Sequence, residues 1–478
     1  MRSEKINYIY FIMALMMICG CKTINSNLSI AELKLPSSFN SSKDTANIAK
    51  INWRNYFKDE LLLNLIDTAL SKNYDVQIAL QKIYIARSGV RFAKSEMLPK
   101  VDGGIYAGLT RYGKFTESGQ GNATTPYPDD PDKVIPNPVQ DYYLGLTTTW
   151  EVDIWGRLKN QHKSAMANYL ASIECKNFVV SNLVAEIAIS YYELIGLDNE
   201  LDIIRQTIQR QNDALNVAKI QKEAGRANDL AIQQFQSQLL NSKAEEREIM
   251  QQINEMENKI NFFLSRFPQT IERKKDRLYQ EMPTQISMGI PSQLLSYRPD
   301  IREAELQVQA TRFDLNAAKA AFFPNFNIGA TLGFQSFNPK FLLSTPASIG
   351  FSALGGMIAP LINKNAIKAN FNYAQASQLT AMYNYQKVIL NGYVEVSNEL
   401  NSIDNLREIN AYKNEQKDIL MQSVETANEL YKTGKANYIE VLLAQQNSLQ
   451  TQLELIGISK RLRIATVNLY KALGGGWD

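Results

Sequence analysis

The sequence predicts a mainly α-helical chain that carries two pairs of membrane-type β-strands and is built as a tandem repeat. A shift of 225 residues aligns Asp75 with Asp300, and a shift of 209 aligns Gly225 with Gly434, each within a matching stretch. The alternating strand patterns lie next to long stretches without proline, such as 139–267. A repeat of this length indicates two copies of one supersecondary unit.

The first unit begins with two predicted helices. Apolar residues recur at helical spacing over 60–70, and the break at Asn73 is followed by Asp75, which we expect to cap a second helix. This helix runs through Ile78, Ile85 and Phe92 toward Leu98 and ends before Pro99, because the residue before a proline is pushed out of the α region.

The hydrophobic period then changes from that of a helix to that of a strand. Residues at about 101–111 and 142–154 alternate between apolar side chains and polar or small ones, and the intervening 112–141, rich in Gly, Pro and Asp, is predicted as a loop. Strands of about ten residues with one apolar face are typical of transmembrane β-barrels, and Trp150 and Trp155 suit an interfacial belt. A soluble, half-buried hairpin fits the same pattern.

A long helical hairpin follows these strands. Helix-forming residues dominate from Arg157 to Gly225, as one helix or as two with a break near Gly196. Such a segment spans about 100 Å at 1.5 Å per residue. The chain reverses at Gly225 and returns to Phe263, and no ordinary globular domain needs helices of this length.

The second unit repeats this order. A helix from Asp300 to Phe323 precedes strands at about 326–335 and 348–358, and a second long hairpin turns at Gly434. The alignment offset falls from 225 to 209 because the second strand loop is shorter than the first.

The N-terminus predicts export and a lipid anchor. A basic start and an apolar run from Tyr8 to Ile18 are typical of a secretory signal peptide, and the run is too short to span a bilayer. It ends in Ile18-Cys19-Gly20-Cys21, which resembles the bacterial lipobox, although Cys19 stands where Ala or Ser is usual. Cleavage after Gly20 would make Cys21 the lipidated first residue. An ordinary signal peptide with incidental cysteines is the alternative.

The composition argues against several classes of protein. Cys175 is the one cysteine beyond the signal, so no disulfide framework is expected. A net charge of +3 over 478 residues gives no nucleic-acid footprint, and no other apolar run is long enough for a transmembrane helix. The single histidine, His162, lies in a predicted solvated helix, and no metalloprotease, P-loop or nucleophile-elbow motif occurs. We therefore expect no enzyme activity, metal or cofactor.

Four amphipathic strands imply an oligomer. A sheet cannot leave unpaired edges in lipid, and closure takes roughly eight strands or more. Identical chains must then share one barrel, and the long helices must likewise pack around a ring. This reasoning leaves two, three or four copies open.

Several segments resemble signatures of the TolC-like outer membrane efflux proteins, in the lipoprotein branch that serves pumps of the resistance-nodulation-division class. The segments are GIPSQLLSYRPDIREAE at 289–305, WEVDIWGR at 150–157, YKTGKANYIEVL at 431–442, and the C-terminal 469–477. They occur in the family's order and cover nearly the whole mature chain.

This resemblance implies a homotrimer with a twelve-stranded barrel in the outer membrane and a helical tunnel of roughly 100 Å across the periplasm. The implied function is a passive exit duct that docks a periplasmic adaptor and, through it, an inner-membrane pump. An N-terminal segment at 21–58 and a linker at 268–296 would form an equatorial belt with the C-terminus. The repeats would occupy 59–267 and 297–478, after a signal peptide at 1–20.

The resemblance also indicates candidate site residues at the helix reversals. Gly225 and Gly434 should mark the tip of the tunnel, where Glu440 matches the first of two acids found in many relatives and Leu443 replaces the second. Leu443 then either lines an apolar constriction or packs between helices. Basic residues near the reversals are candidates for partner contacts; they are Lys222, Arg226, Lys432 and Lys435. Ser265-Arg266-Phe267 is a second departure, at a turn where a Leu-Gly pair is common.

Three other functions remain as alternatives. A periplasmic adaptor lipoprotein also carries a long helical hairpin, but within compact β domains. An outlet for type I protein secretion and a metal-efflux outlet belong to the same family and differ in cargo. The methionines form no clustered stripe, so a copper role is not favoured, and the sequence does not identify the substrate, the cognate pump or the resting state of the gate.

Overall fold

The structure is a computed structural model that describes residues 35–39, 48–127, 130–279, 289–360 and 364–477. The predicted signal peptide and Cys21 lie outside the described residues. The chain divides into two compact units. We call Val90–Ala165 with Gln309–Met382 the strand unit, and Leu33–Gly89, Met166–Val308 and Tyr383–Asp478 the helical unit.

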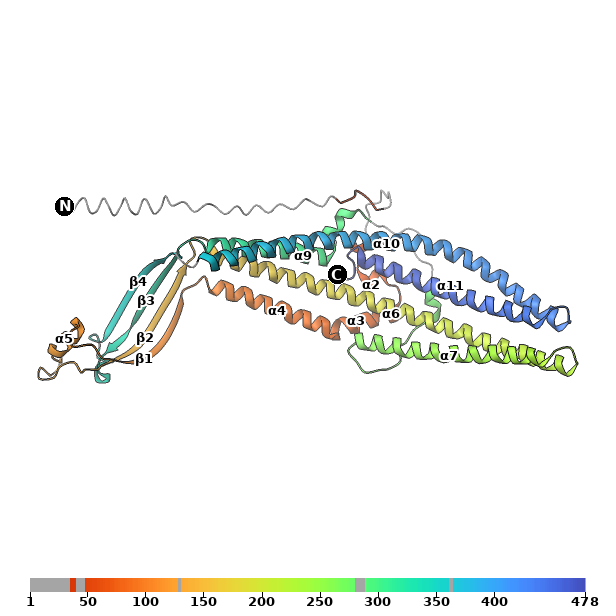
Figure 1. Cartoon of the computed structure of the whole chain (residues 1–478), viewed down its shortest axis with the longest axis horizontal. Coiled ribbons are helices and arrows are strands. Elements are labelled where there is room, and N and C mark those ends of the chain that lie inside the picture. Colours follow the sequence, from red (N-terminus) through yellow and green to blue (C-terminus); the bar gives the residue numbers. More distant parts are fainter. Residues whose placement is uncertain (1–34, 40–47, 128–129, 280–288, 361–363, 478) are drawn as a thin grey trace. The chain divides into compact units, whose positions relative to one another are not determined.

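The strand unit contains a single four-stranded antiparallel sheet in the order β1-β2-β3-β4, with the strands side by side in Figure 1. The strands are β1 (Lys100–Thr110), β2 (Val139–Val152), β3 (Asn325–Ser336) and β4 (Ile349–Ile358). All four lie within a few residues of their predicted positions. The predicted loop between β1 and β2 is not wholly irregular, because it contains α5 (Glu117–Thr124), whose first turn is capped by the Thr116 side chain.

The helices follow the predicted repeat closely. The first repeat contains α4 (Tyr74–Ser95), α6 (Arg157–Glu223) and α7 (Asp229–Phe263), and the second contains α9 (Pro299–Ala320), α10 (Lys364–Lys432) and α11 (Tyr438–Ala472). Corresponding helices have 22 and 22, 67 and 69, and 35 and 35 residues. The remaining helices are α2 (Trp53–Tyr56), α3 (Glu60–Lys72), α8 (Leu294–Tyr297) and the short 3-10 helices η1 (Ile48–Lys50), η2 (Lys275–Tyr279), η3 (Pro291–Gln293) and η4 (Pro339–Phe341).

The cap predicted at Asp75 is wrong. The Asn73 side chain accepts hydrogen bonds from the backbone amides of Asp75 and Val76, at 2.8 and 3.2 Å, while its own amide donates to the Phe263 carbonyl at 2.9 Å. Asn73 therefore caps α4 and ties it to the end of α7, a long-range contact that local sequence could not reveal.

The break considered near Gly196 is also absent, because α6 continues through it. A Cβ at this position would lie 2.8 Å from Cδ of Lys460 on α11. The glycine therefore leaves room for the Lys460 side chain and does not break the helix.

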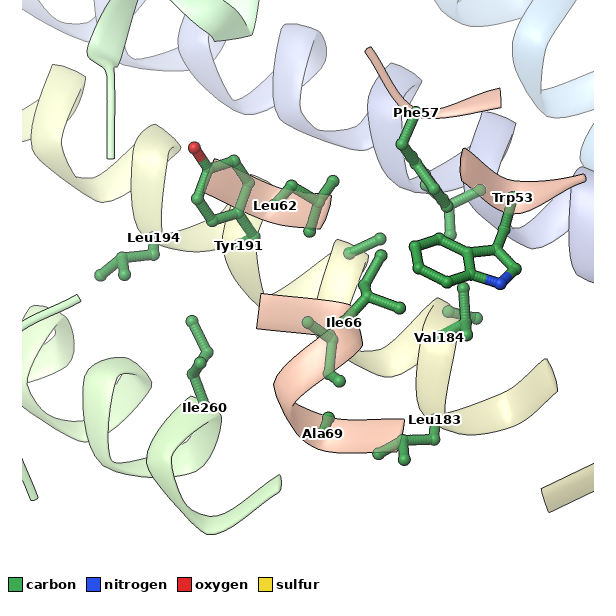
Figure 2. Packing of buried hydrophobic residues seen from close by; sticks show 14 of the residues in the cluster. Trp53, Phe57, Leu62, Ile66, Ala69, Leu183, Val184, Tyr191, Leu194 and Ile260 are labelled. Atoms are coloured by element: carbon green, nitrogen blue, oxygen red, sulfur yellow. The ribbon is translucent and has the colours of Figure 1, made fainter. Parts of the chain in front are cut away.

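The main core of the helical unit lies where α3 packs on α6 and α7, and Figure 2 shows Leu62 and Ile66 among side chains of these helices. Tyr191 of α6 is fully buried, and its hydroxyl donates to the Asp59 carboxylate at 2.9 Å. The sequence predicted no further helix able to cross a membrane, but among the described residues α6 is long and apolar enough to do so. Because 61% of its most apolar 18-residue stretch is buried inside the protein, we interpret α6 as a core helix.

Replacement of the fully buried Ile66 tests this core. We expect Ile66→Ala to lower the free energy of unfolding by about 2–5 kcal/mol, because it removes packed methyl groups and leaves a cavity. Asn64→Ala, on the exposed side of the same helix, should change it by no more than about 0.5 kcal/mol. Thermal unfolding of the detergent-solubilised protein measures both, and equal losses would contradict the assigned core.

Candidate functional site

The sheet has one apolar face and one mainly polar face, which also carries Leu354 and Ile358 of β4. Residues directly opposite one another share a face, and the register pairs Ile105 with Leu144, Leu146 with Leu332, and Leu332 with Phe351. The six side chains predicted to face lipid all fall on this apolar face; they are Val101, Ile105, Leu146, Phe326, Ile328 and Phe351. Thr147, predicted on the other face, pairs with Asp102 and Thr331.

The sheet is folded toward its polar face. Gly145 of β2 lies opposite Gly333 of β3, and a Cβ added to either glycine would lie 2.6 Å from the Cα of the other. Neighbouring strands in a flat sheet keep such atoms much farther apart, since opposed Cα atoms are normally about 4.5–5.5 Å apart. The polar face is therefore concave at this level.

The two helix reversals are alike in backbone geometry. Gly225 and Gly434 have positive φ angles of 69° and 73°, which glycine adopts without strain. In the first turn the amide of Arg226 donates to the Gln221 carbonyl at 2.8 Å, and in the second the amide of Lys435 donates to Leu430 at 2.8 Å. Both are Schellman C-caps.

The reversals lie at the same end of the helical unit (Figure 1). The buried amide of Gln221 donates to the Tyr431 carbonyl at 2.9 Å, and Leu215, Phe235 and Val441 share a small hydrophobic cluster beneath the turns. We call this end of the four helices the tip.

The candidate gate residues are on the surface of the single chain. Glu440 is exposed in the first turn of α11. Leu443 is 52% exposed, whereas its neighbour Leu442 packs against the tip cluster. The Leu443 side chain is therefore free to contact a partner or a second copy of the chain.

Two of the four basic candidate residues form ion pairs within the described part of the chain, and two do not. Lys222 pairs with Asp229 and Lys432 pairs with Glu429, in both cases at the protein surface. Arg226 and Lys435, which occupy equivalent places in the two turns, are exposed and make no ion pair with any described residue. Their charges remain open to a partner.

A sequence model of the family described as "Outer membrane efflux protein" matches residues 65–264 and 290–475. The chain belongs to the outer membrane efflux protein family. The two matched segments correspond to the two repeats, and the chain is an outer-membrane channel of a tripartite efflux pump rather than an enzyme. This membership rules out the periplasmic adaptor alternative.

Relatives within this family match along the full chain. It is 26% identical to "Probable outer membrane lipoprotein SilC" of Salmonella typhimurium, over 98% of both chains, and 25% identical to "Cation efflux system protein CusC" of Escherichia coli, over 90% of both. A crystal structure of a membrane protein from Pseudomonas aeruginosa is 25% identical and gives a TM-score of 0.82, covering 93% of this chain and 97% of that one. The outer membrane and a lipoprotein branch are thus the family context of this channel.

A buried arginine that the sequence did not predict joins three helices of this efflux channel. Arg298 donates to Asp300 at 2.7 Å, to Glu395 of α10 at 2.7 Å and to the Ala472 carbonyl of α11 at 2.8 Å. Burial alone would lower the pKa of Arg298, but hydrogen bonds to Asp300 and Glu395 and their charges raise it above its usual value. The sequence signal that could have identified Arg298 is its position directly before Pro299, which begins helix α9.

Within the described residues, no group of three or more His, Cys, Asp or Glu side chains is arranged to hold a metal. Cys175 is half-buried, and burial, with the charge of Glu303, raises the pKa of its thiol. A thiol held protonated in this way is a poor nucleophile.

Proposed function

We propose that three copies of this chain share one twelve-stranded barrel in the outer membrane and one helical tunnel below it, and that this assembly is the exit duct for an inner-membrane pump. The observation that carries the proposal is the open sheet, in which the outer edges of β1 and β4 pair with no strand of the described chain. Unpaired backbone groups in lipid cost several kcal/mol each. Three copies close the sheet with the number of strands that the family resemblance implies.

The polar face of the sheet then lines the lumen. Two observations support this orientation. The exposed apolar side chains suit lipid, and the concavity beside Gly145 and Gly333 lies on the polar face, as closure of a barrel around a water-filled interior requires.

Exposed apolar stripes on the helices support packing between copies. The positions used to predict α4 by periodicity are largely exposed, although a helix of a monomer would bury them. On α4 the exposed residues Ile78, Ile85 and Phe92 recur every seven residues, and on α10 Tyr383 with Leu390 and Tyr412 with Ile419 form two pairs of the same spacing. Neighbouring copies would cover them in a ring of helices.

Three segments assigned to the equatorial belt, 21–58, 268–296 and the C-terminus, form part of the proposal. Their described residues contact one another closely. Tyr56 stacks on Tyr470 with ring centroids 4.0 Å apart, and Phe39, Leu294 and Leu473, one from each segment, share a buried hydrophobic cluster. These contacts support a belt that holds the two repeats together.

The tip is the proposed docking and gating end. An adaptor, and through it a pump of the resistance-nodulation-division type, would contact the turns, where Arg226 and Lys435 offer unpaired charges. Around a three-fold axis, three copies of Glu440 would form an acidic ring and three copies of Leu443 an adjacent apolar ring. Carboxylate rings favour cations, and apolar constrictions gate by dewetting.

The cargo of the duct is a separate matter. A name such as that of CusC describes cation efflux for that protein, and an identity of 25% does not transfer a cargo. A metal-efflux outlet and a type I secretion outlet therefore stay alternatives, and which pump and adaptor genes neighbour this one would decide between them. A wide conduit leaves selectivity to the pump.

Assembly and strand orientation are tested together. Leu146→Arg should lower the yield of trimer, because a charge facing lipid costs about 2–4 kcal/mol near the bilayer midplane. Thr147→Arg on the opposite face should be tolerated. Native mass spectrometry of the solubilised protein measures both. Equal trimer yields would refute the orientation, and a monodisperse monomer of the unsubstituted chain would refute the shared barrel.

The gate is tested by single-channel conductance in planar bilayers. Glu440→Gln should reduce cation preference or block by multivalent cations, because it removes the ring's charge. Leu443→Ser should raise the resting conductance, because it makes the constriction wettable. Conductance and selectivity that are unaltered in both variants would place the constriction elsewhere.

The lipid anchor is tested by mass spectrometry of the mature N-terminus. We expect cleavage after Gly20 and acylation of Cys21, with more than one acyl chain because a single chain binds membranes only marginally. Cys21→Ala should impair sorting more than it impairs the assembled channel. An unmodified Cys21 would refute the anchor.

A further inference from the structure

A row of glycines crosses the whole sheet at one level. The register places Gly104 opposite Gly145, Gly145 opposite Gly333, and Gly333 opposite Gly350, so each strand contributes one glycine to the polar face. Glycine within a strand costs about 0.5–1 kcal/mol of conformational entropy and offers no side chain for packing. Four aligned glycines therefore need a local reason.

Two tyrosine rings of the polar face lie over this row. A Cβ on Gly104 would lie 2.8 Å from Cε2 of Tyr106, and a Cβ on Gly145 would lie 2.6 Å from the hydroxyl of Tyr143. The Tyr143 hydroxyl donates to the Leu146 carbonyl of its own strand at 3.0 Å, and the ring centroids of Tyr106 and Tyr143 are 6.0 Å apart. Both rings thus lie along the wall, in the space that side chains at the glycines would occupy.

The four glycines differ in what they face. At Gly145 and Gly333 the nearest atoms include backbone, since an added Cβ would lie 2.6 Å from the opposite Cα. At Gly104 the three nearest atoms all belong to the Tyr106 ring, and at Gly350 nothing lies within 4 Å. Gly145 and Gly333 therefore permit the bend of the sheet, whereas Gly104 leaves the space that the Tyr106 ring occupies. We call this space at Gly104 the seat.

We propose that the glycine row holds Tyr106 and Tyr143 flat against the inner wall of the barrel, and that these rings set the bore of the duct at this level. The inference deepens the proposed function and rests on its assignment of the polar face to the lumen. Covering a strand glycine with an aromatic ring restores the packing that the glycine lacks. A methyl group at Gly104 leaves no room for the seated ring, which must then swing toward the lumen.

The seat explains why the rings do not obstruct the duct. Tyr106 is 60% exposed, so its ring presents an aromatic surface to whatever passes. A tyrosine standing upright on a closed wall would project into the bore from every copy. Held flat, the same residues line the wall and leave the centre open, so the largest cargo that passes depends on the seat.

The test measures the bore by polymer exclusion. The reconstituted channel is studied in planar bilayers with polyethylene glycols of increasing size on the side of the β1–β2 and β3–β4 loops, and the largest polymer that lowers the conductance defines the cut-off. Gly104→Ala should lower the cut-off. Tyr106→Ala and Tyr143→Ala should each raise it, and the double variant Gly104→Ala/Tyr106→Ala should recover at least the native cut-off. Gly329→Ala is the control and should leave it unchanged, because Gly329 is on the same face of the central strand β3 and an added Cβ would lie 3.8 Å from its nearest neighbour.

Oligomer yield separates the seat from the bend. Gly145→Ala should lower the yield of oligomer even when combined with Tyr143→Ala, because its Cβ still meets the Gly333 backbone. If Gly104→Ala also gives a low yield of oligomer, the polymer cut-off of Tyr106→Ala tests whether this ring sets the bore. The proposal that the rings set the bore is wrong if Tyr106→Ala and Tyr143→Ala keep the polymer cut-off of the native channel. It is also wrong if the double variant has as low a cut-off as Gly104→Ala. A parent chain that forms no conducting oligomer overturns the proposed function instead.

Discussion

The backbone of a membrane-spanning sheet must pair every amide, and this requirement governs much of the molecule. The described chain provides four strands and leaves the outer edges of β1 and β4 unpaired. An isolated copy would expose these edges and an apolar face to water or lipid, at several kcal/mol for each unpaired group in lipid. In the proposed shared barrel, assembly is therefore a condition of stability for the strand unit. The exposed stripes of α4 and α10 suggest that the long helices have the same need, since their apolar surface exceeds what one copy buries.

The helical unit meets a different constraint, because hairpins of this length need to be fixed along their sides. The main cluster packs α3 against α6 and α7, and polar contacts add specific ties, as between Tyr191 and Asp59. Arg298 binds α9, α10 and α11 through two carboxylates and one carbonyl. Removing one partner of such a buried cluster leaves a charge without compensation, which is strongly destabilising. At the tip, a small hydrophobic cluster and the buried hydrogen bond from Gln221 of α6 to Tyr431 of α10 join the two hairpins.

Sequence periodicity was sufficient for the repeat, the four strands and both reversals, because these depend on local alternation and on glycine at positive φ. It missed details of side-chain contact. Asn73 rather than Asp75 caps α4, through bonds from the amides of Asp75 and Val76, and Gly196 accommodates Lys460 rather than ending a helix. Ile78 and Ile85 correctly indicated a helix but gave no indication that its apolar side is exposed in a single copy. The family signatures identified the channel, while the roles of Glu440 and Leu443 depend on an axis that one chain does not contain.

The shared backbone of the two turns has a consequence for symmetry. A ring of three copies would present six turns of nearly the same shape, so its tip would be approximately six-fold although its barrel is three-fold. The side chains limit this equivalence: the Lys222–Asp229 ion pair of the first turn is replaced at the matching places of the second by Tyr431 and Tyr438. A partner that contacts only backbone and the unpaired Arg226 and Lys435 would meet six similar sites, whereas one that contacts neighbouring side chains would meet two alternating sets of three. The duplicated chain thus allows a tip of one symmetry to meet a partner of another.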